Sequence, residues 1–293
     1  MQIQSSKEHN AGERLGSEPI YLAIACHYLD PRAVAAKLSA LFQNWTNLRI
    51  KIYTTNDKHR HLVGSNSRTP GEIVARYVGN QFNDFTAYMS AVSELTAEIE
   101  NGSKSSFIFL NDTLFLKHPA SALIALFKDC IPTIGNCSLP LICGRTHAYR
   151  VLMQTSPFSP GLDRYVSTFM FGTNFSGLKL LQSTFAHCDT FIASLDLDKN
   201  VLEKIPSKLA ETLRLHLELG TSVNSWKGRR DRDVIRRKAI AVLLEQLISS
   251  RFYEEGLILP IAYTTAREWR LNIAYVLFRT LHGRRAINIV RAK

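Results

Sequence analysis

The chain has 293 residues, of which 45% are hydrophobic and 21% charged, and its formal net charge is +11 at pH 7. This much apolar material supports a folded core and excludes a disordered chain, a collagen and a disulfide-stapled miniprotein. No apolar run approaches the roughly 20 residues needed to span a bilayer, and residues 1–17 lack the apolar centre of a secretory signal. We therefore expect a cytoplasmic protein that begins with a disordered tail, residues 1–17.

The positive charge is concentrated at the C-terminal end of the chain. Residues 226–293 contain 15 Lys and Arg against 6 Asp and Glu, a net charge of +9, whereas the first 225 residues contain 21 against 19, a net charge of +2. A basic end predicts an anionic partner, which could be nucleic acid, an acidic membrane surface or a polyphosphorylated substrate. We divide the chain accordingly into the tail, a domain at 18–225 and a basic helical region at 226–293.

The first half of the chain alternates between strand-like and helical patterns. Residues 20–27 form an almost continuous apolar run, typical of a strand buried on both faces. Asp30 and Pro31 suit the cap and the first turn of a helix. The elements expected next are strands at 48–54, 73–78 and 106–110 and a helix at 85–99, with a polar loop at 55–71. Such an alternation predicts an α/β fold with a parallel sheet.

The second half has a less regular pattern. Residues 139–143 and 167–172 resemble strands, and helical spacing of apolar residues recurs at 202–219, 234–248 and 265–281. None of the motifs for dinucleotide binding, P-loops, serine hydrolases or zincins is present. Candidate functional residues must therefore be sought among the acidic and amide side chains at strand ends.

Four polar segments follow the predicted strands, at 25–28, 54–57, 80–84 and 111–113. Ligands of parallel α/β sheets bind beyond the carboxyl ends of the strands, so these segments should surround one crevice. A carboxylate at the end of a buried strand, such as Asp112, can hold a divalent cation against a diphosphate or bind a sugar. The alternative is that Asn111 and Asp112 only turn the chain or cap the next helix.

Taken in order, these segments resemble the rhamnan-synthesis F-type glycosyltransferases, GT-A-fold enzymes that build bacterial surface polysaccharides. The resemblance covers about residues 18–225, and its motifs are Cys26-His27-Tyr28, residues 79–85, Asn111-Asp112-Thr113, residues 165–172 and residues 218–222. Asn83 stands where the family has Arg, and Asp112 is the single carboxylate at the position of the Asp-x-Asp motif.

The resemblance implies a GT-A-like, Rossmann-type nucleotide-binding sheet with a basic helical C-terminal extension. The implied activity is transfer of a hexosyl or deoxyhexosyl group from a UDP-, dTDP- or GDP-sugar to a hydroxyl of a lipid-linked surface-polysaccharide or lipopolysaccharide acceptor. Glu218 and Asp112 are the implied catalytic residues, and Asp112 would hold Mn²⁺ or Mg²⁺. The donor would be bound by His27, Tyr28, Asn80, Asn83, Asp84, Asn111, Asp112 and Thr113. The acceptor side would comprise Thr168, Phe169 and Glu218.

Acceptors of this kind are lipid-linked, so the basic region should hold the enzyme on the anionic inner face of the membrane. We expect Arg229, Arg230, Arg236 and Arg237 to make these contacts. One alternative is a nucleic-acid-binding protein that uses the same arginines, although no nucleic-acid-reading motif accompanies them and no nucleic acid partner is expected. A second alternative is a non-catalytic scaffold with a glycosyltransferase-like fold.

Overall fold

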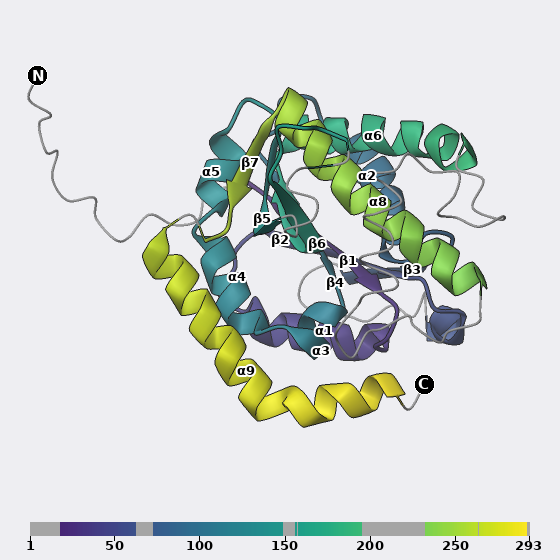
Figure 1. Cartoon of the computed structure of the whole chain (residues 1–293), viewed down its shortest axis with the longest axis vertical. Helices are drawn as coiled ribbons and strands as arrows, with labels where there is room; N and C mark the ends of the chain where they lie inside the picture. The colour runs from purple at the N-terminus through teal and green to yellow at the C-terminus, as the bar shows by residue number, and fades with distance from the viewer. Residues whose placement is uncertain are drawn as a thin grey trace, which may run out of the picture.

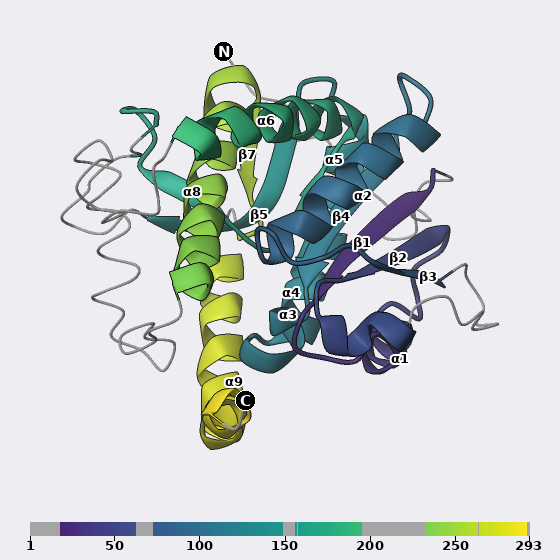
Figure 2. The same ribbon diagram turned by 90° about the vertical axis from the view of Figure 1, so that its right-hand side faces the viewer.

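The structure is a computed structural model that describes residues 18–62, 73–148, 156, 158–194, 232–262 and 264–291. One seven-stranded sheet, ordered β3-β2-β1-β4-β6-β5-β7, runs through the molecule, with helices on both faces (Figures 1 and 2). The strands are β1 (Ile20–Cys26), β2 (Leu48–Thr54), β3 (Ile73–Tyr77), β4 (Ser106–Asn111), β5 (Leu141–Ala148), β6 (Arg164–Thr173) and β7 (Leu257–Pro260). The α/β class predicted from the sequence is confirmed.

The sheet is mostly parallel. Strands β3, β2, β1 and β4 pair in parallel, as the sequence predicted, and β5 pairs in parallel with β7. The exception is β6, which is antiparallel to both of its neighbours, β4 and β5. The parallel pairing predicted for the first-half strands is therefore confirmed, and the antiparallel strand β6, which lies beside β4, comes from the second half of the chain.

The helices form one layer on each face of the sheet. One layer contains α2 (Asp84–Glu98), α6 (Phe175–Ser194) and α8 (Arg232–Glu255). The other contains α1 (Pro31–Leu41), α3 (Thr113–Lys117), α4 (Ala120–Lys128), α5 (Ile131–Asn136) and α9 (Thr265–Arg291). Side chains of β1 alternate between the two cores, with Tyr21 on the α2 side and Leu22 on the α1 side. The apolar run of β1 thus reflects a strand that is covered on both faces.

Several elements have nearly the bounds that the sequence predicted. Strand β2 matches completely, β1, β3 and β4 differ by one residue at one end, and α2 is shifted by one residue at both ends. The side chain of Asp30 caps α1, because it accepts a hydrogen bond of 2.7 Å from the backbone N–H of Arg32. Not predicted were the 3₁₀ helix η1 (Asp57–Leu62), β7 and the helices α3 to α6. The predicted tail at 1–17 and the predicted helix at 202–219 lie outside the described residues.

The described part of the basic C-terminal region is built into the same sheet. Strand β7 pairs with β5, α8 packs against the sheet through residues such as Phe252, and α9 contributes Leu271 and Tyr275 to the opposite core. Among the helices that the structure describes, none is long and apolar enough to cross a membrane.

Candidate functional site

The order of the strands reverses between β1 and β4. From β1 the chain proceeds outward to β2 and β3, whereas β4 lies on the other side of β1 and leads to the remaining strands. In open α/β sheets, ligands bind at the carboxyl ends of the strands at such a switch point. Residues 27–30 follow β1 there, and β4 ends at Asn111 and is followed by residues 112 and 113.

The structure brings together the four polar segments that the sequence singled out. The side-chain amide of Asn56 donates to the carbonyl oxygen of His27 (2.8 Å), which ties the loop after β2 to the loop after β1. The amide of Asn111 donates to Asp84 Oδ2 (2.7 Å), which ties the end of β4 to the start of α2. The backbone N–H groups of His27 and Tyr28 donate to Asp112, which joins these two pairs, so the four segments form one hydrogen-bonded rim at the carboxyl edge of the sheet.

Within this rim, Asp112 is fully buried. Its Oδ2 accepts three backbone N–H groups, from His27 (2.9 Å), Tyr28 (2.6 Å) and Leu29 (2.7 Å), and so fixes the loop after β1. Burial raises the pKa of Asp112 to about 7, and the negative charge of Asp84 adds to the increase, although the three N–H groups favour the anion. Its Oδ1 is buried without a hydrogen-bond partner.

This geometry shows that Asp112 positions the backbone of the loop after β1. The structural role that the sequence suggested was different, namely a turn of the chain or a cap of the next helix. Its side chain makes no cap hydrogen bond to α3, because Oδ2 is directed at the loop 27–29 instead. Its catalytic and metal-binding roles stay predictions.

Asn111 forms hydrogen bonds to two other residues of the rim. It is buried, and its Oδ1 accepts the backbone N–H of Thr113 (3.2 Å) and a close hydrogen bond from the Thr113 hydroxyl. Its amide nitrogen at the same time holds Asp84. One amide side chain thus fixes two of the predicted donor-binding residues relative to each other.

The loop before α2 has an unusual backbone. Gly79 and Asn83 have φ values of +77° and +55°, and the ψ of −132° at Asn83 lies outside the left-handed helical well that asparagine tolerates. Asn83 makes no side-chain cap to α2. In the same loop Asn80 Oδ1 is buried without a partner. Such strain and unpaired polar groups concentrate at functional sites.

Aromatic and basic side chains stand over the loop after β1. The rings of His27 and Tyr28 pack edge to face, 4.9 Å apart, and His27 Nδ1 is 3.0 Å from the Thr55 hydroxyl. Tyr28 is 37% exposed, with Lys117 Nζ 5.8 Å from its ring centroid. An exposed aromatic ring beside a cation can stack on a nucleobase while the cation attracts a phosphate.

On the β6 side, Thr168 connects helix α2 to helix α8. Its backbone N–H and hydroxyl donate to Glu245 Oε1 (2.8 and 3.2 Å), and its carbonyl oxygen accepts the hydroxyl of Tyr88 (2.8 Å). Burial raises the pKa of Tyr88, and the charges of Asp84, Asp112 and Glu245 raise it further. The charges of three carboxylates therefore act on this tyrosine.

Glu245 was missed in the sequence because it stands in the apolar run of a helix. The signal that could have revealed it is a pair of polar residues, Glu245 and Gln246, within a stretch of aliphatic side chains. Glu218, Arg229 and Arg230 lie outside the described residues. Arg237 is half-buried on α8, and Arg236 is on the same helix, with its side chain outside the description.

Phe169 belongs to an aromatic cluster that the sequence did not reveal. The ring of His118 stacks on Phe169 at 3.9 Å, and His118 Nδ1 lies 2.7 Å from the hydroxyl of Tyr275 on α9. The guanidinium of Arg145 covers the Tyr275 ring at 4.0 Å. The predicted acceptor side is therefore supported by a residue of α9.

A divalent cation at this edge would have a limited set of protein ligands. Among the side chains described, no three of His, Cys, Asp and Glu gather as a metal-binding group. Proteins often hold Mg²⁺ with one or two carboxylates and substrate phosphates. Asp112 Oδ1 fits this need, being a buried carboxylate oxygen without a hydrogen-bond partner. Asp84 is the second carboxylate, near enough to raise the pKa of Asp112.

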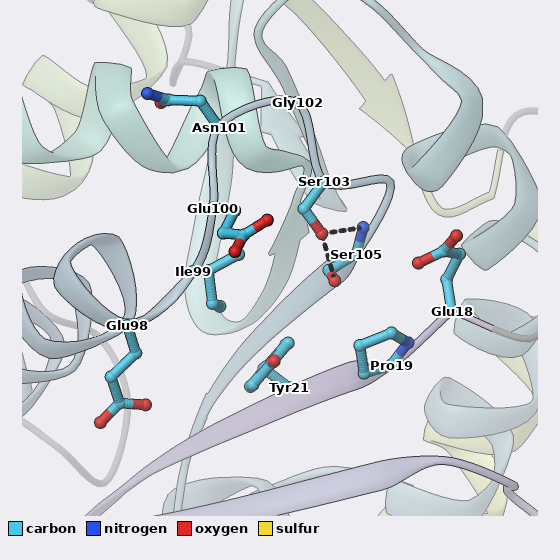
Figure 3. Close-up of a pocket in the computed structure, with 10 residues that line it drawn as sticks. All are labelled: Glu18, Pro19, Tyr21, Glu98, Ile99, Glu100, Asn101, Gly102, Ser103 and Ser105. Atoms are coloured by element: carbon cyan, nitrogen blue, oxygen red, sulfur yellow. Dashed lines mark hydrogen bonds between the residues drawn. The ribbon is translucent and has the colours of Figure 1, made fainter.

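Two hollows lie away from the rim. One of about 400 Å³, shown in Figure 3, is at the amino ends of β1 and β4, where the Ser103 and Ser105 hydroxyls bond each other and Glu98 pairs with Lys51. The other, of about 520 Å³, lies between α1, the α3–α4 segment and α9. The first is at the edge opposite the switch point, so it does not belong to the candidate site.

No protein-family model matches the chain, and no curated protein shows significant sequence similarity to it.

Proposed function

We propose that the chain is a glycosyltransferase that binds a nucleotide sugar at the carboxyl edge between β1 and β4. The observation that carries the proposal is the convergence of four polar loops at this switch point, with Asn111 joining Asp84 to Thr113. The seven-stranded, mostly parallel sheet is compatible with the GT-A fold that the resemblance implies. The unpaired acceptor atoms of Asn80 and Asp112 are further support, because they need a hydrogen-bond donor or a cation.

In this proposal the loop after β1 binds the donor. Tyr28 stacks on the nucleobase, and Lys117 beside it attracts the diphosphate. Asp84 and Asp112 would hold Mg²⁺ or Mn²⁺, which would neutralise the charge of the departing diphosphate. Asp112 also keeps the 27–29 backbone in place through its three N–H hydrogen bonds.

The acceptor hydroxyl enters from the β6 side, near Thr168 and Phe169. A carboxylate takes the proton of the acceptor hydroxyl as the hydroxyl oxygen forms a bond to C1 of the sugar. At the same time the bond from C1 to the diphosphate oxygen breaks, and the nucleoside diphosphate leaves. Glu245 is the candidate base within the described residues, because its carboxylate is bound to Thr168 beside the rim. Glu218, implied by the resemblance, is the other candidate.

The acceptor is a lipid-linked surface-polysaccharide or lipopolysaccharide precursor, which places the reaction at the cytoplasmic face of a membrane. The arginines Arg229, Arg230, Arg236 and Arg237 would contact anionic lipid there. Basic residues near such a surface contribute about 1 kcal/mol each.

The proposal is tested by thermal shift with UDP-, dTDP- and GDP-sugars, each with and without Mg²⁺ or Mn²⁺. A donor at 100 times its Kd should stabilise the protein by about 2.7 kcal/mol, which corresponds to a rise in Tm of roughly 4 °C for a chain of this size. Asp84→Asn should reduce that rise, whereas Glu98→Gln at the opposite edge of the sheet should leave it unchanged. Failure of every donor to shift Tm would overturn the proposal.

A further inference from the structure

Helix α9 has an apolar face that the described residues leave uncovered. Five apolar side chains on it are between 37% and 73% exposed, namely Trp269, Ile273, Val276, Leu277 and Leu281. They recur every three or four residues, so they lie on one side of the helix, along about 18 Å of its length. Figure 1 shows α9 on the outside of the molecule, on the side away from α2, α6 and α8.

A second apolar stripe holds α9 on the body of the protein. Leu271 and Tyr275 are buried, and Arg267 forms an ion pair of 2.8 Å with Asp129 at the end of α4. The exposed residues therefore are not needed to attach the helix. An exposed apolar patch of this kind marks an interaction surface.

The charge of the helix indicates what that surface meets. Residues 265–291 contain six arginines and one acidic residue, Glu268, a net charge of +5. A helix with an exposed stripe of Trp, Leu, Ile and Val and an excess of arginine is the pattern that lies in the plane of an anionic membrane surface.

We propose that α9 docks on an anionic lipid bilayer, with Trp269, Val276, Leu277 and Leu281 inserted at the boundary between headgroups and acyl chains. A second copy of this chain is a poorer partner, because a stable dimer interface uses about 20–30 residues a side. Two α9 helices with a charge of +5 each would also repel one another. An anionic bilayer satisfies both the apolar stripe and the charge.

The hollow of about 520 Å³ extends this surface. Leu277 and Leu281 belong to the exposed stripe and also line the hollow, together with Leu41, Phe115 and Ala274. Apolar surface thus continues from the docked helix to the helices that follow β1 and β4. His118 also lines this hollow, and it contacts Tyr275 of α9 and stacks on Phe169. Docking would therefore hold the predicted acceptor side close to the bilayer.

This inference deepens the membrane location within the proposed function, and its test involves no sugar donor, so the two can fail separately. The full chain is sedimented with vesicles of phosphatidylcholine alone or with 30% phosphatidylglycerol, in low and high salt. We expect binding that needs the anionic lipid and weakens several-fold in high salt. The emission of Trp269 should shift to the blue on binding, and Trp269→Phe should abolish that shift.

The paired substitution Val276→Ser and Leu277→Ser should weaken vesicle binding at least tenfold while leaving Tm nearly unchanged, because both side chains are exposed. Leu139→Ser is the matched control, since Leu139 is 54% exposed and Leu277 is 56% exposed; this variant should bind as the wild type does. Equal binding to neutral vesicles, or unaltered binding by the Val276 and Leu277 variant, would overturn the proposal. The proposal would also be overturned if the wild type were a dimer that the Val276 and Leu277 variant converts to a monomer without loss of lipid binding. If vesicle binding is lost only in the double variant Arg236→Ser and Arg237→Ser, docking belongs to α8 and the proposal for α9 is overturned too.

Discussion

At the level of single residues, Asp112 is held by two opposing effects. Full burial disfavours its charge, whereas three backbone N–H groups that converge on Oδ2 favour it. Burial is the larger effect, and the pKa of Asp112 rises to about 7. Near neutral pH the carboxyl group therefore titrates, so the loop after β1 is held by a group that changes its charge within the physiological range.

The raised pKa of Asp112 makes folding stability depend on pH. In the unfolded chain the group titrates near 3.8, so between pH 4 and 7 the unfolded state releases a proton that the native state retains. The stability that Asp112 contributes is complete below pH 4 and is lost as pH rises to about 7, by about 4 kcal/mol.

Asp112→Asn removes this titration. Its free energy of unfolding should therefore rise relative to that of the wild type between pH 4 and 7 and remain level above pH 8. Urea unfolding at several pH values measures the difference. A constant difference across this range would show that the native pKa of Asp112 is not raised.

A substitution of Glu245 tests whether this residue is the general base of the proposed transfer reaction. If it accepts the proton of the acceptor hydroxyl, Glu245→Gln should lower kcat by a factor of 10² or more with little change in the donor Kd. Glu218→Gln, compared in parallel, should behave in this way only if Glu218 is the base. Weaker donor binding with kcat unchanged at saturation would remove Glu245 from this role.

At the level of elements, α1 begins where Asp30 caps it. The side-chain oxygen of Asp30 satisfies the backbone N–H of Arg32, and Pro31 occupies the first turn, where no N–H is needed. This helix follows β1 directly, so its start also ends the 27–29 loop that Asp112 holds.

Asp30→Ala should therefore destabilise the protein by about 1 kcal/mol. Asp30→Asn keeps the cap oxygen and should cost much less. Chemical unfolding of the two variants measures the difference, and equal losses in both would mean that the charge of Asp30, rather than the cap hydrogen bond, stabilises α1.

On the scale of the whole molecule, the chain before residue 195 and the chain after residue 231 share one sheet and two cores. Phe252 of α8 is fully buried in the core that also contains Tyr21 of β1 and Phe109 of β4. Strand β7 completes the sheet next to β5. The two parts should therefore unfold together.

Phe252→Ala tests this cooperativity. The substitution leaves a cavity and should cost about 3–5 kcal/mol. Trp45, buried beside Phe42 in the first half of the chain, reports on the other end of the molecule when Trp226 and Trp269 are replaced by Phe. In Phe252→Ala, the unfolding transitions followed by Trp45 fluorescence and by far-ultraviolet circular dichroism should have the same midpoint, lower than that of the protein with Phe252. Two separate transitions would show that the basic region unfolds as an independent unit.

The sequence predicted the parts of this fold that depend on neighbouring residues. The apolar runs of β1 and β4, the alternation of β2 and the cap at Asp30 are local patterns, so their bounds were accurate to about a residue. The polar segments that end these strands were predicted for the same reason. Short helices such as α3 and α5 were not predicted, because five or six residues are too few to show the helical periodicity of apolar side chains.

Only the tertiary structure decided how the side chains at the strand ends are used. The sequence determined that Asp112 follows a buried strand, but the N–H groups that it binds are 83–85 residues away. Glu245 likewise reaches Thr168 across 77 residues, and it does so because α8 packs on β6. Hydrogen bonds of this range depend on which strands and helices become neighbours, and the chain's local periodicity does not encode that choice. The reversed direction of β6, which places Thr168 beside the end of β4, is a consequence of the same packing.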